Sequence, residues 1–323
     1  MFLDIFIQSL TPMLVLFLCL SIGFIAKRLR LLPDNAHTVM SKLETWIFCP
    51  ALTISTFATR FTVQNITKNY VIILYAVLGT VIAFILGNIL ARIFVRQNVY
   101  ERNVYKYAMT VANYGFMGDP IVLGLFGTDV LFLYKLFTLP LAVLIYTWGF
   151  STLIPSGEKK TPLYKKFINP MFFSLFIGAI VGITGLGNIL PKFINNTLSN
   201  LSGCMGPVAM LLTGFTIGGY ELKMMLTKKK VYFASLIRLV ILPAIIVGFL
   251  MLCGANDATL LCAFFAFATP LGMNTVVFPL AYGADPSTGA SMAMISHTLC
   301  ILTIPLMFSV FGLFVDVTPF FLT

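Results

Sequence analysis

Apolar residues dominate the chain in ten runs of about 20 residues, and short polar turns separate the runs. A run of this length and apolarity is typical of a helix that crosses the hydrocarbon core of a membrane. The ten runs cover residues 5–26, 38–59, 70–94, 104–126, 130–153, 170–190, 197–218, 231–252, 257–282 and 286–314. The pattern therefore predicts an all-α membrane protein with ten transmembrane helices.

Two of these runs are interrupted by polar and turn-forming residues at matching places. The fourth run contains Asn113-Tyr-Gly-Phe-Met-Gly-Asp-Pro120, and the ninth contains Thr269-Pro-Leu-Gly-Met-Asn-Thr275 at an offset of 156 residues. Pro50 in the second run and Pro207 in the seventh are 157 residues apart. Gly and Pro interruptions at corresponding positions of two halves indicate a transporter binding site built from broken helices.

Each half of the chain holds five predicted helices, and five is an odd number. The second half must therefore enter the membrane from the opposite side, which makes a 5+5 inverted repeat. We expect the broken helices 4 and 9 to cross near the middle of the membrane. Residues 1–153 form the first predicted repeat, 154–169 a short cytoplasmic linker, and 170–323 the second repeat.

Composition and charge narrow the class of protein and its orientation. Apolar residues make up 59% of the chain, charged residues make up 10%, and the mean hydropathy is +0.97, which excludes an ordinary soluble domain. Seventeen of the 21 Lys and Arg residues fall at or near the turns after the odd-numbered helices. This is the positive-inside pattern, so we place those turns in the cytoplasm and both termini outside the plasma membrane.

The net charge of +10 predicts contact with anionic lipid headgroups on the cytoplasmic side, and not with nucleic acid. Arg238 is counted on this side. It could reach an anionic solute, but its long side chain is expected instead to reach back to the membrane surface. The remaining four cations are assigned to the outer face: Arg60, Lys68, Lys135 and Lys192.

The candidate substrate-binding residues lie at the two helix interruptions. Asn113 and Asn274 each carry a carboxamide, which donates and accepts hydrogen bonds and can hold a carboxylate or a cation. Each asparagine could instead cap its own broken helix. The other candidates are the breakers and small polar residues beside them: Gly115, Gly118, Pro120, Pro270, Gly272 and Thr275.

Three ionisable residues in the apolar runs are candidates for ion coupling. Asp119 lies near the middle of helix 4, where a charge is costly and usually functional, so it could bind H⁺ or Na⁺ or pair with a base. It could instead be protonated or act as a cap before Pro120. Glu44 lies near one end of helix 2 and could sit among cytoplasmic headgroups. His297 lies in helix 10 and could titrate near neutral pH, or it could be a packing residue with its hydrogen bonds satisfied.

Enzymatic and metal-binding motifs are not visible in the sequence. There is no phosphate-binding loop, no HExxH and no Ser/His/Asp constellation, so we do not expect an enzyme. The six cysteines occur singly, which predicts neither a disulfide framework nor a metal site. No cofactor is expected apart from H⁺ or Na⁺ as a coupling ion.

The chain resembles the auxin efflux carrier family, which includes plant auxin carriers and bacterial malate or malonate permeases. The resemblance rests on Asn113-x-Gly-Phe-Met-Gly-x-Pro120, on Ala268-Thr-Pro-Leu-Gly-Met-Asn-Thr-Val-Val-Phe278 and on Leu302-Thr-Ile-Pro305-Leu. It implies a ten-helix inverted repeat, an elevator-like movement and organic anions as substrates. In plant members the asparagine that opens the helix 4 motif contacts the substrate carboxylate, and Asn113 occupies that position. Asp119 departs from the apolar residue common in plant members, so their coupling does not transfer.

We therefore expect a secondary active transporter that moves a small mono- or dicarboxylate by alternating access, with symport of H⁺ or Na⁺ as one mode. The alternatives are a cation/proton antiporter, a sodium-coupled symporter with a related crossover fold, and a membrane sensor that binds a solute without moving it. The sequence leaves open the substrate, the direction of transport and the oligomeric state, a homodimer being one possible assembly.

Overall fold

The computed structural model describes residues 2–153, 169–281 and 284–322, and within these ranges the structure is helical, without strands. The predicted linker 154–169 lies outside the described residues except for Asn169. The elements up to residue 153 are α1 (Phe2–Arg28), α2 (Ala36–Leu43), η1 (Glu44–Phe48), α3 (Cys49–Arg60), α4 (Val63–Asn69), α5 (Val71–Phe94), α6 (Val99–Thr110), η2 (Tyr114–Gly118), α7 (Asp119–Leu144), η3 (Ile145–Gly149) and α8 (Phe150–Leu153). The later elements are α10 (Pro170–Ile183), η4 (Leu186–Asn188), α11 (Lys192–Gly218), α12 (Leu222–Leu226), α13 (Lys229–Leu236), η5 (Ile237–Ile241), α14 (Leu242–Leu252), α15 (Asp257–Ala268), α16 (Asn274–Ala281), α17 (Ser287–Phe311) and η6 (Thr318–Phe320).

Six helical stretches are long and apolar enough to cross a membrane among the described residues. They are Phe2–Arg28, Val71–Phe94, Tyr114–Leu153, Lys192–Gly218, Lys229–Leu252 and Ser287–Phe311. Two shorter apolar helices, α10 and α15, lie within other predicted runs. The described residues thus confirm an all-helical fold with six candidate membrane spans, whereas the ten-helix inverted repeat stays a prediction.

Asparagine caps begin several of the helices. Asn98 Oδ1 accepts a hydrogen bond from the Glu101 N–H at 3.0 Å, and Asn256 Oδ1 accepts one from the Thr259 N–H at 2.9 Å. Asn169 Oδ1 accepts from two N–H groups in the first turn of α10. The first N–H groups of a helix have no intrahelical acceptor, so a polar cap at the start of an apolar helix fixes where that helix begins.

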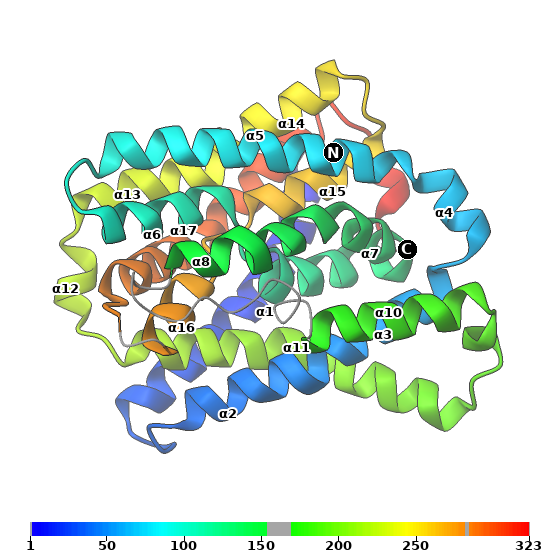
Figure 1. The fold of residues 1–323 in the computed structure, drawn as a ribbon, viewed down its shortest axis with the longest axis horizontal. Coiled ribbons are helices and arrows are strands. Elements are labelled where there is room, and N and C mark those ends of the chain that lie inside the picture. Colours follow the sequence, from blue (N-terminus) through cyan, green and yellow to red (C-terminus); the bar gives the residue numbers. More distant parts are fainter. Residues whose placement is uncertain (1, 154–168, 282–283, 323) are drawn as a thin grey trace.

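Four helices pack into a group in which backbone meets backbone: α1 with α11, and α3 with α10 (Figure 1). A Cβ atom added to Gly214 of α11 would lie 1.8 Å from the Leu20 carbonyl oxygen of α1. A Cβ atom on Gly182 of α10 would lie 2.5 Å from the Phe57 carbonyl oxygen of α3. Glycine is required at both positions because only a residue without a side chain permits such close approach of two helices.

The helix α7 bends back on itself at Gly127, whose φ of 74° and ψ of −170° are not helical. A positive φ of this size favours glycine, since it strains residues that carry a Cβ atom. Lys135 Nζ donates a hydrogen bond to Asp119 Oδ2 although 16 residues separate them. A straight helix would place these residues about 24 Å apart along its axis, so the two arms of α7 lie side by side.

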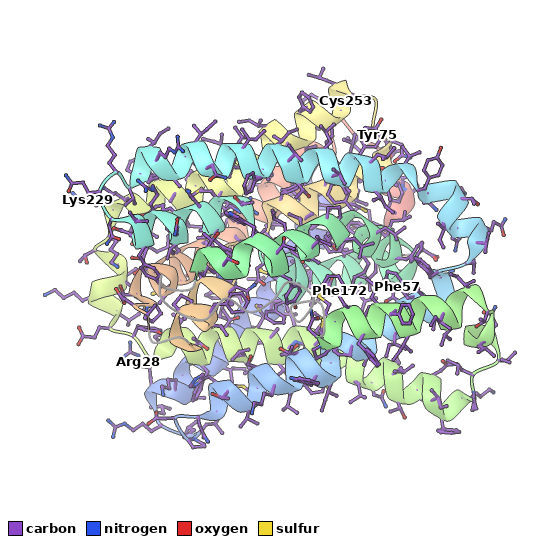
Figure 2. The ribbon with its side chains drawn as sticks, in the orientation of Figure 1. Arg28, Phe57, Tyr75, Phe172, Lys229 and Cys253 are labelled. Carbon is purple, nitrogen blue, oxygen red and sulfur yellow. The ribbon has the colours of Figure 1, made fainter. Side chains whose placement is uncertain are left out.

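The turns gather at two opposite ends of the helices. At one end, an Arg28 guanidinium nitrogen donates to the Tyr220 carbonyl at 2.5 Å, and Lys230 Nζ donates to the Phe94 carbonyl at 3.3 Å. At the other end, the Tyr75 hydroxyl donates to the Cys253 carbonyl at 3.0 Å. Figure 2 shows Arg28 and Lys229 at the first end and Tyr75 and Cys253 at the second. Basic residues therefore collect at the end that holds the turns after α1, α5 and α11.

Candidate functional site

Both predicted helix interruptions are present, and they touch each other. The first separates α6, which ends at Thr110, from the helix that resumes at Tyr114, and the second separates α15 from α16. Ala112 and Leu271 form an isolated antiparallel bridge, and the Asn113 N–H donates to the Pro270 carbonyl oxygen at 2.7 Å. The two interruptions thus supply hydrogen-bond partners for each other's unpaired backbone N–H and C=O groups. Non-helical backbone at membrane depth needs such partners.

A cavity of about 280 Å³ lies beside the crossing of the two interruptions, large enough for a small organic solute and some water. Its wall contains five of the predicted site residues: Asn113, Gly115, Asp119, Gly272 and Asn274. Its other lining residues are Ser41, Thr45, Cys49, Ala112, Tyr114, Phe116, Ile145, Tyr146, Asn169, Met171, Met205, Leu212, Met273, Val277 and Phe278. The wall is mostly apolar with a few polar groups that converge, as in many small-molecule sites.

Asn113 is held by His297 at the first interruption. The Asn113 Nδ2 and His297 Nε2 atoms are 3.1 Å apart, and both side chains are buried. On the other side of the ring, His297 Nδ1 lies 2.7 Å from the Ala293 carbonyl oxygen. The carbonyl can only accept, so Nδ1 carries a proton, and in the neutral ring Nε2 must then accept from Asn113 Nδ2.

Asn274 is held by Tyr107 at the second interruption. Asn274 Nδ2 donates to the Tyr107 hydroxyl oxygen at 2.7 Å. The remaining contacts of this interruption are also between neutral groups. The Leu271 N–H donates to Ser296 Oγ at 3.3 Å, and the Thr275 hydroxyl donates to the Gly272 carbonyl at 3.0 Å. Thr275 therefore braces the turn into α16 and is not part of the cavity wall.

Asp119 opens α7 and is paired with Lys135 from the second arm of that helix. Both side chains are buried, and a buried ion pair offsets much of the cost of removing each charge from water. Asp119 Oδ1 has no hydrogen-bond partner among the described residues, and Asp119 lines the cavity. Lys135 is consequently not at the outer face of the membrane, where its place in the sequence had suggested it.

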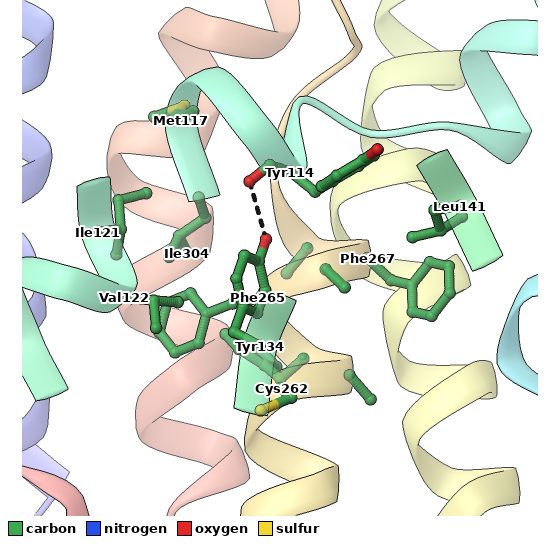
Figure 3. Close-up of a cluster of buried hydrophobic side chains, with 14 of the residues drawn as sticks. Tyr114, Met117, Ile121, Val122, Tyr134, Leu141, Cys262, Phe265, Phe267 and Ile304 are labelled. Atoms are coloured by element: carbon green, nitrogen blue, oxygen red, sulfur yellow. Dashed lines mark hydrogen bonds between the residues drawn. The ribbon is translucent and has the colours of Figure 1, made fainter. Parts of the chain in front are cut away.

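The second arm of α7 also holds the helix start through Tyr134. The Tyr134 hydroxyl donates to the Tyr114 carbonyl oxygen at 3.0 Å, a bond drawn in Figure 3 among apolar side chains of α7, α15 and α17. Gly118 packs directly against this hydroxyl. Pro120 packs against Gly206 of α11. Gly118, Pro120 and Pro270 thus shape the backbone around the cavity, which they do not line.

Glu44 and Arg238 correct two predictions about charges at the membrane surface. Neither side chain reaches the surface, because both are fully buried, each in a π-helical segment, η1 and η5. Neither Glu44 oxygen and none of the three Arg238 guanidinium nitrogens has a hydrogen-bond partner in the described part of the chain. π-Helical turns inside α-helices are frequent at functional sites. Ser41 and Thr45, one turn before Glu44 and directly after it, line the cavity.

Several residues of the site were not found from the sequence. Tyr107 and Tyr134 were missed because tyrosines in apolar helices give no local sign of a distant partner. Lys135 could have been found, because a single cation inside an apolar run is as unusual as a single carboxylate such as Asp119.

Residues 2–153, 169–281 and 284–322 contain no group of three or more His, Cys, Asp and Glu side chains suited to a metal ion.

Comparison with known proteins assigns the chain to a family. The sequence profile of the family described as membrane transport protein matches residues 8–308, which is most of the chain. A search of curated proteins returned no match. The matched region contains both interruptions and every residue of the cavity wall. The chain therefore belongs to this membrane transport family, the auxin efflux carrier family.

Proposed function

We propose that the protein is a secondary active transporter that moves a small organic anion, a mono- or dicarboxylate, across the plasma membrane. The observation that carries this proposal is the crossing of two helix interruptions at an internal cavity whose wall holds both Asn113 and Asn274. Family membership supports the class, and the two carboxamides suit a carboxylate, which accepts hydrogen bonds from amide N–H groups.

The helix starts beside the cavity favour an anion. Helical structure begins at Tyr114 after the first interruption and at Asn274 after the second. The first N–H groups of a helix carry partial positive charge, which favours a negative group in the cavity. The effect is expected mainly at the first start, because at the second the Thr275 and Val276 N–H groups already donate to the Gly272 and Met273 carbonyl oxygens. The Asp119 carboxylate on the wall is already neutralised by Lys135 and does not oppose this preference.

Alternating access is proposed as an elevator-like movement of two groups of helices. One group is α1, α3, α10 and α11, which the backbone contacts at Gly182 and Gly214 make stiff. The other group carries the two interruptions on α6, α7, α15 and α16. The basic end of the molecule, with Arg28 and Lys229, faces the cytoplasm in this proposal, because positive turns remain on that side.

The test is uptake of radiolabelled malate into liposomes that contain the purified protein. Uptake is measured with an imposed pH gradient, with an imposed sodium gradient and with neither. We expect uptake to follow one gradient and to fall at least about tenfold in Asn113→Ala and in Asn274→Ala, because each loses a hydrogen bond to a charged group. Asn196→Ala, on the exposed start of α11, is the matched control and keeps the parental rate.

Two results would overturn the proposal. If both cavity variants insert normally and transport malate at the parental rate and affinity, the cavity is not the binding site. If malate and other small carboxylates bind to the protein but never cross the membrane, the protein is a sensor and not a carrier.

A further inference from the structure

We propose that His297 controls which end of the Asn113 carboxamide faces the cavity, so that proton uptake at His297 and binding of an organic anion at Asn113 occur together. This inference rests on the proposed function and deepens it, because it names the coupling ion as H⁺ and its binding atom as His297 Nε2. His297 is then a positioning residue, which acts on the solute through Asn113.

The argument begins with the donors and acceptors around the ring. His297 Nδ1 faces the Ala293 carbonyl at 2.7 Å and must donate to it. In the neutral imidazole the Nε2 atom then has only a lone pair, so the group 3.1 Å away must be the donating amide nitrogen of Asn113. Asn113 lines the cavity. Its amide nitrogen is engaged by His297, so we infer that the carbonyl oxygen, which has no partner among the described residues, is the end that faces the cavity. A carbonyl oxygen repels a carboxylate.

Protonation reverses this arrangement. When water delivers a proton to His297 Nε2, the ring becomes an imidazolium that donates at both nitrogens. Its Nε2–H then requires an acceptor, and a turn of the Asn113 carboxamide by about 180° supplies the carbonyl oxygen. The two amide N–H bonds now point into the cavity, where they can donate to a carboxylate. No bond other than the N–H bond at Nε2 is formed, and release of the proton restores the first state.

The surroundings of His297 make the two events depend on each other. Within the described part of the chain, no carboxylate is hydrogen-bonded or ion-paired to the ring. A buried imidazolium without a counter-charge is unfavourable, and a solute carboxylate beside Asn113 provides that charge. Elements packed against α17 carry further titratable groups, among them Lys27 of α1, Lys223 of α12, Lys229 of α13, Arg238 of η5 and Tyr107 of α6. In the described part of the chain none of these is hydrogen-bonded or ion-paired to the His297 ring, and Asp119 is paired with Lys135.

The contact between Tyr107 and Asn274 differs from that between His297 and Asn113, because it does not depend on a change of protonation. Its hydroxyl accepts from Asn274 Nδ2, but a hydroxyl can also donate. Asn274 can therefore present either end of its carboxamide without any change of protonation. The pair of Tyr107 and Asn274 is the internal control for the pair of His297 and Asn113.

The first experiment uses the full chain in detergent with ¹⁵N-labelled histidine, and it needs no substitution. The protein has two histidines, and the partly exposed His37 serves as the reference ring outside the cavity. We expect the ¹⁵N shifts of His297 near neutral pH to be those of the neutral ring with Nδ1 protonated, and to become those of imidazolium when malate is added. If His297 keeps the neutral shifts with malate bound, the proposal is wrong.

The second experiment measures protons and affinity in the parent, His297→Gln and Tyr107→Phe. In weakly buffered solution with a pH indicator, the parent should take up about one proton for each malate bound, and His297→Gln none. Malate affinity should strengthen up to about tenfold for each unit of falling pH between about pH 8 and pH 7 in the parent and in Tyr107→Phe, and should not change with pH in His297→Gln.

The outcomes separate this proposal from the proposed function. If His297→Gln takes up the same proton with malate, the coupling proposal is overturned while malate transport through Asn113 still stands. If malate neither binds to the parent nor crosses the membrane, the proposed function fails and the coupling fails with it.

Discussion

The two helix interruptions that meet at the cavity match in their sequence pattern and differ in the groups that hold them. The first is fixed by an ion pair between Asp119 and Lys135 and by the imidazole of His297. The second is fixed by neutral hydroxyl groups, chiefly that of Tyr107. The comparison teaches that a matching backbone does not imply matching chemistry, because the ion pair and the imidazole hold the first interruption while hydroxyl groups hold the second.

The largest expected effect on stability comes from removing the cation of the ion pair at the first interruption. Lys135→Met leaves the Asp119 carboxylate buried without its cation, so we expect a loss of about 3–5 kcal/mol in the free energy of unfolding. Thermal unfolding in detergent, followed by tryptophan fluorescence, measures it. The double variant Asp119→Asn with Lys135→Met should recover most of the loss. If the double variant is as unstable as Lys135→Met, lost packing and not the unpaired charge is the cause.

A smaller effect compares one glycine from each interruption. A Cβ atom on Gly118 would lie 2.1 Å from the Tyr134 hydroxyl, so Gly118→Ala should destabilise the protein by about 1–3 kcal/mol. A Cβ atom on Gly272 has its nearest neighbour at 3.4 Å, so Gly272→Ala should stay within about 0.5 kcal/mol of the parent. Combining Gly118→Ala with Tyr134→Phe should cost less than the sum of the two changes, and an additive result would contradict the proposed clash.

The neutral side of the comparison is tested by Tyr107→Phe. This change removes the acceptor of Asn274 Nδ2, so we expect a loss of about 1 kcal/mol in stability and a few-fold weaker binding of malate. Calorimetric titration with malate gives the affinity. Tyr75→Phe is the matched control, because its hydroxyl bonds to the Cys253 carbonyl away from the cavity, and its malate affinity should equal that of the parent. Equal weakening in both variants would show a general loss of stability.

The smallest expected effect on stability is that of Gly115→Ala. No atom lies within 4 Å of a Cβ atom built on Gly115, which lines the cavity. The variant should therefore unfold within about 0.5 kcal/mol of the parent and yet bind malate more weakly, because the methyl group takes up room in the site. Parallel melting and binding measurements separate the two quantities. Unchanged binding would mean that malate does not occupy this part of the cavity.

The sequence predicted the helical class and both interruptions because these depend on local residues. Asn, Gly and Pro break a helix wherever they occur together, as around Asn113 and Asn274. Contacts such as Asp119 with Lys135 depend instead on how far the chain turns at Gly127, which no local pattern specifies. Tyr107 and Asn274 are 167 residues apart, and the local sequence around each residue does not indicate that the other is its partner. The inverted repeat and the roles of the site residues stay predictions.

The buried Glu44 and Arg238 show a second limit of reasoning from the sequence. In a helix that is apolar on every side, the pattern does not tell which face meets protein and which meets lipid. Both residues were therefore assigned to the surface because of their charge. A signal was present, since each precedes a proline in the same apolar run, Pro50 and Pro243. A charge shortly before a proline deserves a search for a widened helical turn.

The fold of α7 at Gly127 also has a consequence for how the protein enters the membrane during synthesis. Each charge placed alone at the centre of a membrane helix costs about 2.5–3.5 kcal/mol on insertion scales. Asp119 leaves the ribosome before Lys135, and its helix would meet the lipid with an unpaired carboxylate if it were released first. The two arms should instead leave the insertion channel together as a hairpin, already paired, so that the bend at Gly127 also governs the order in which the helices are released.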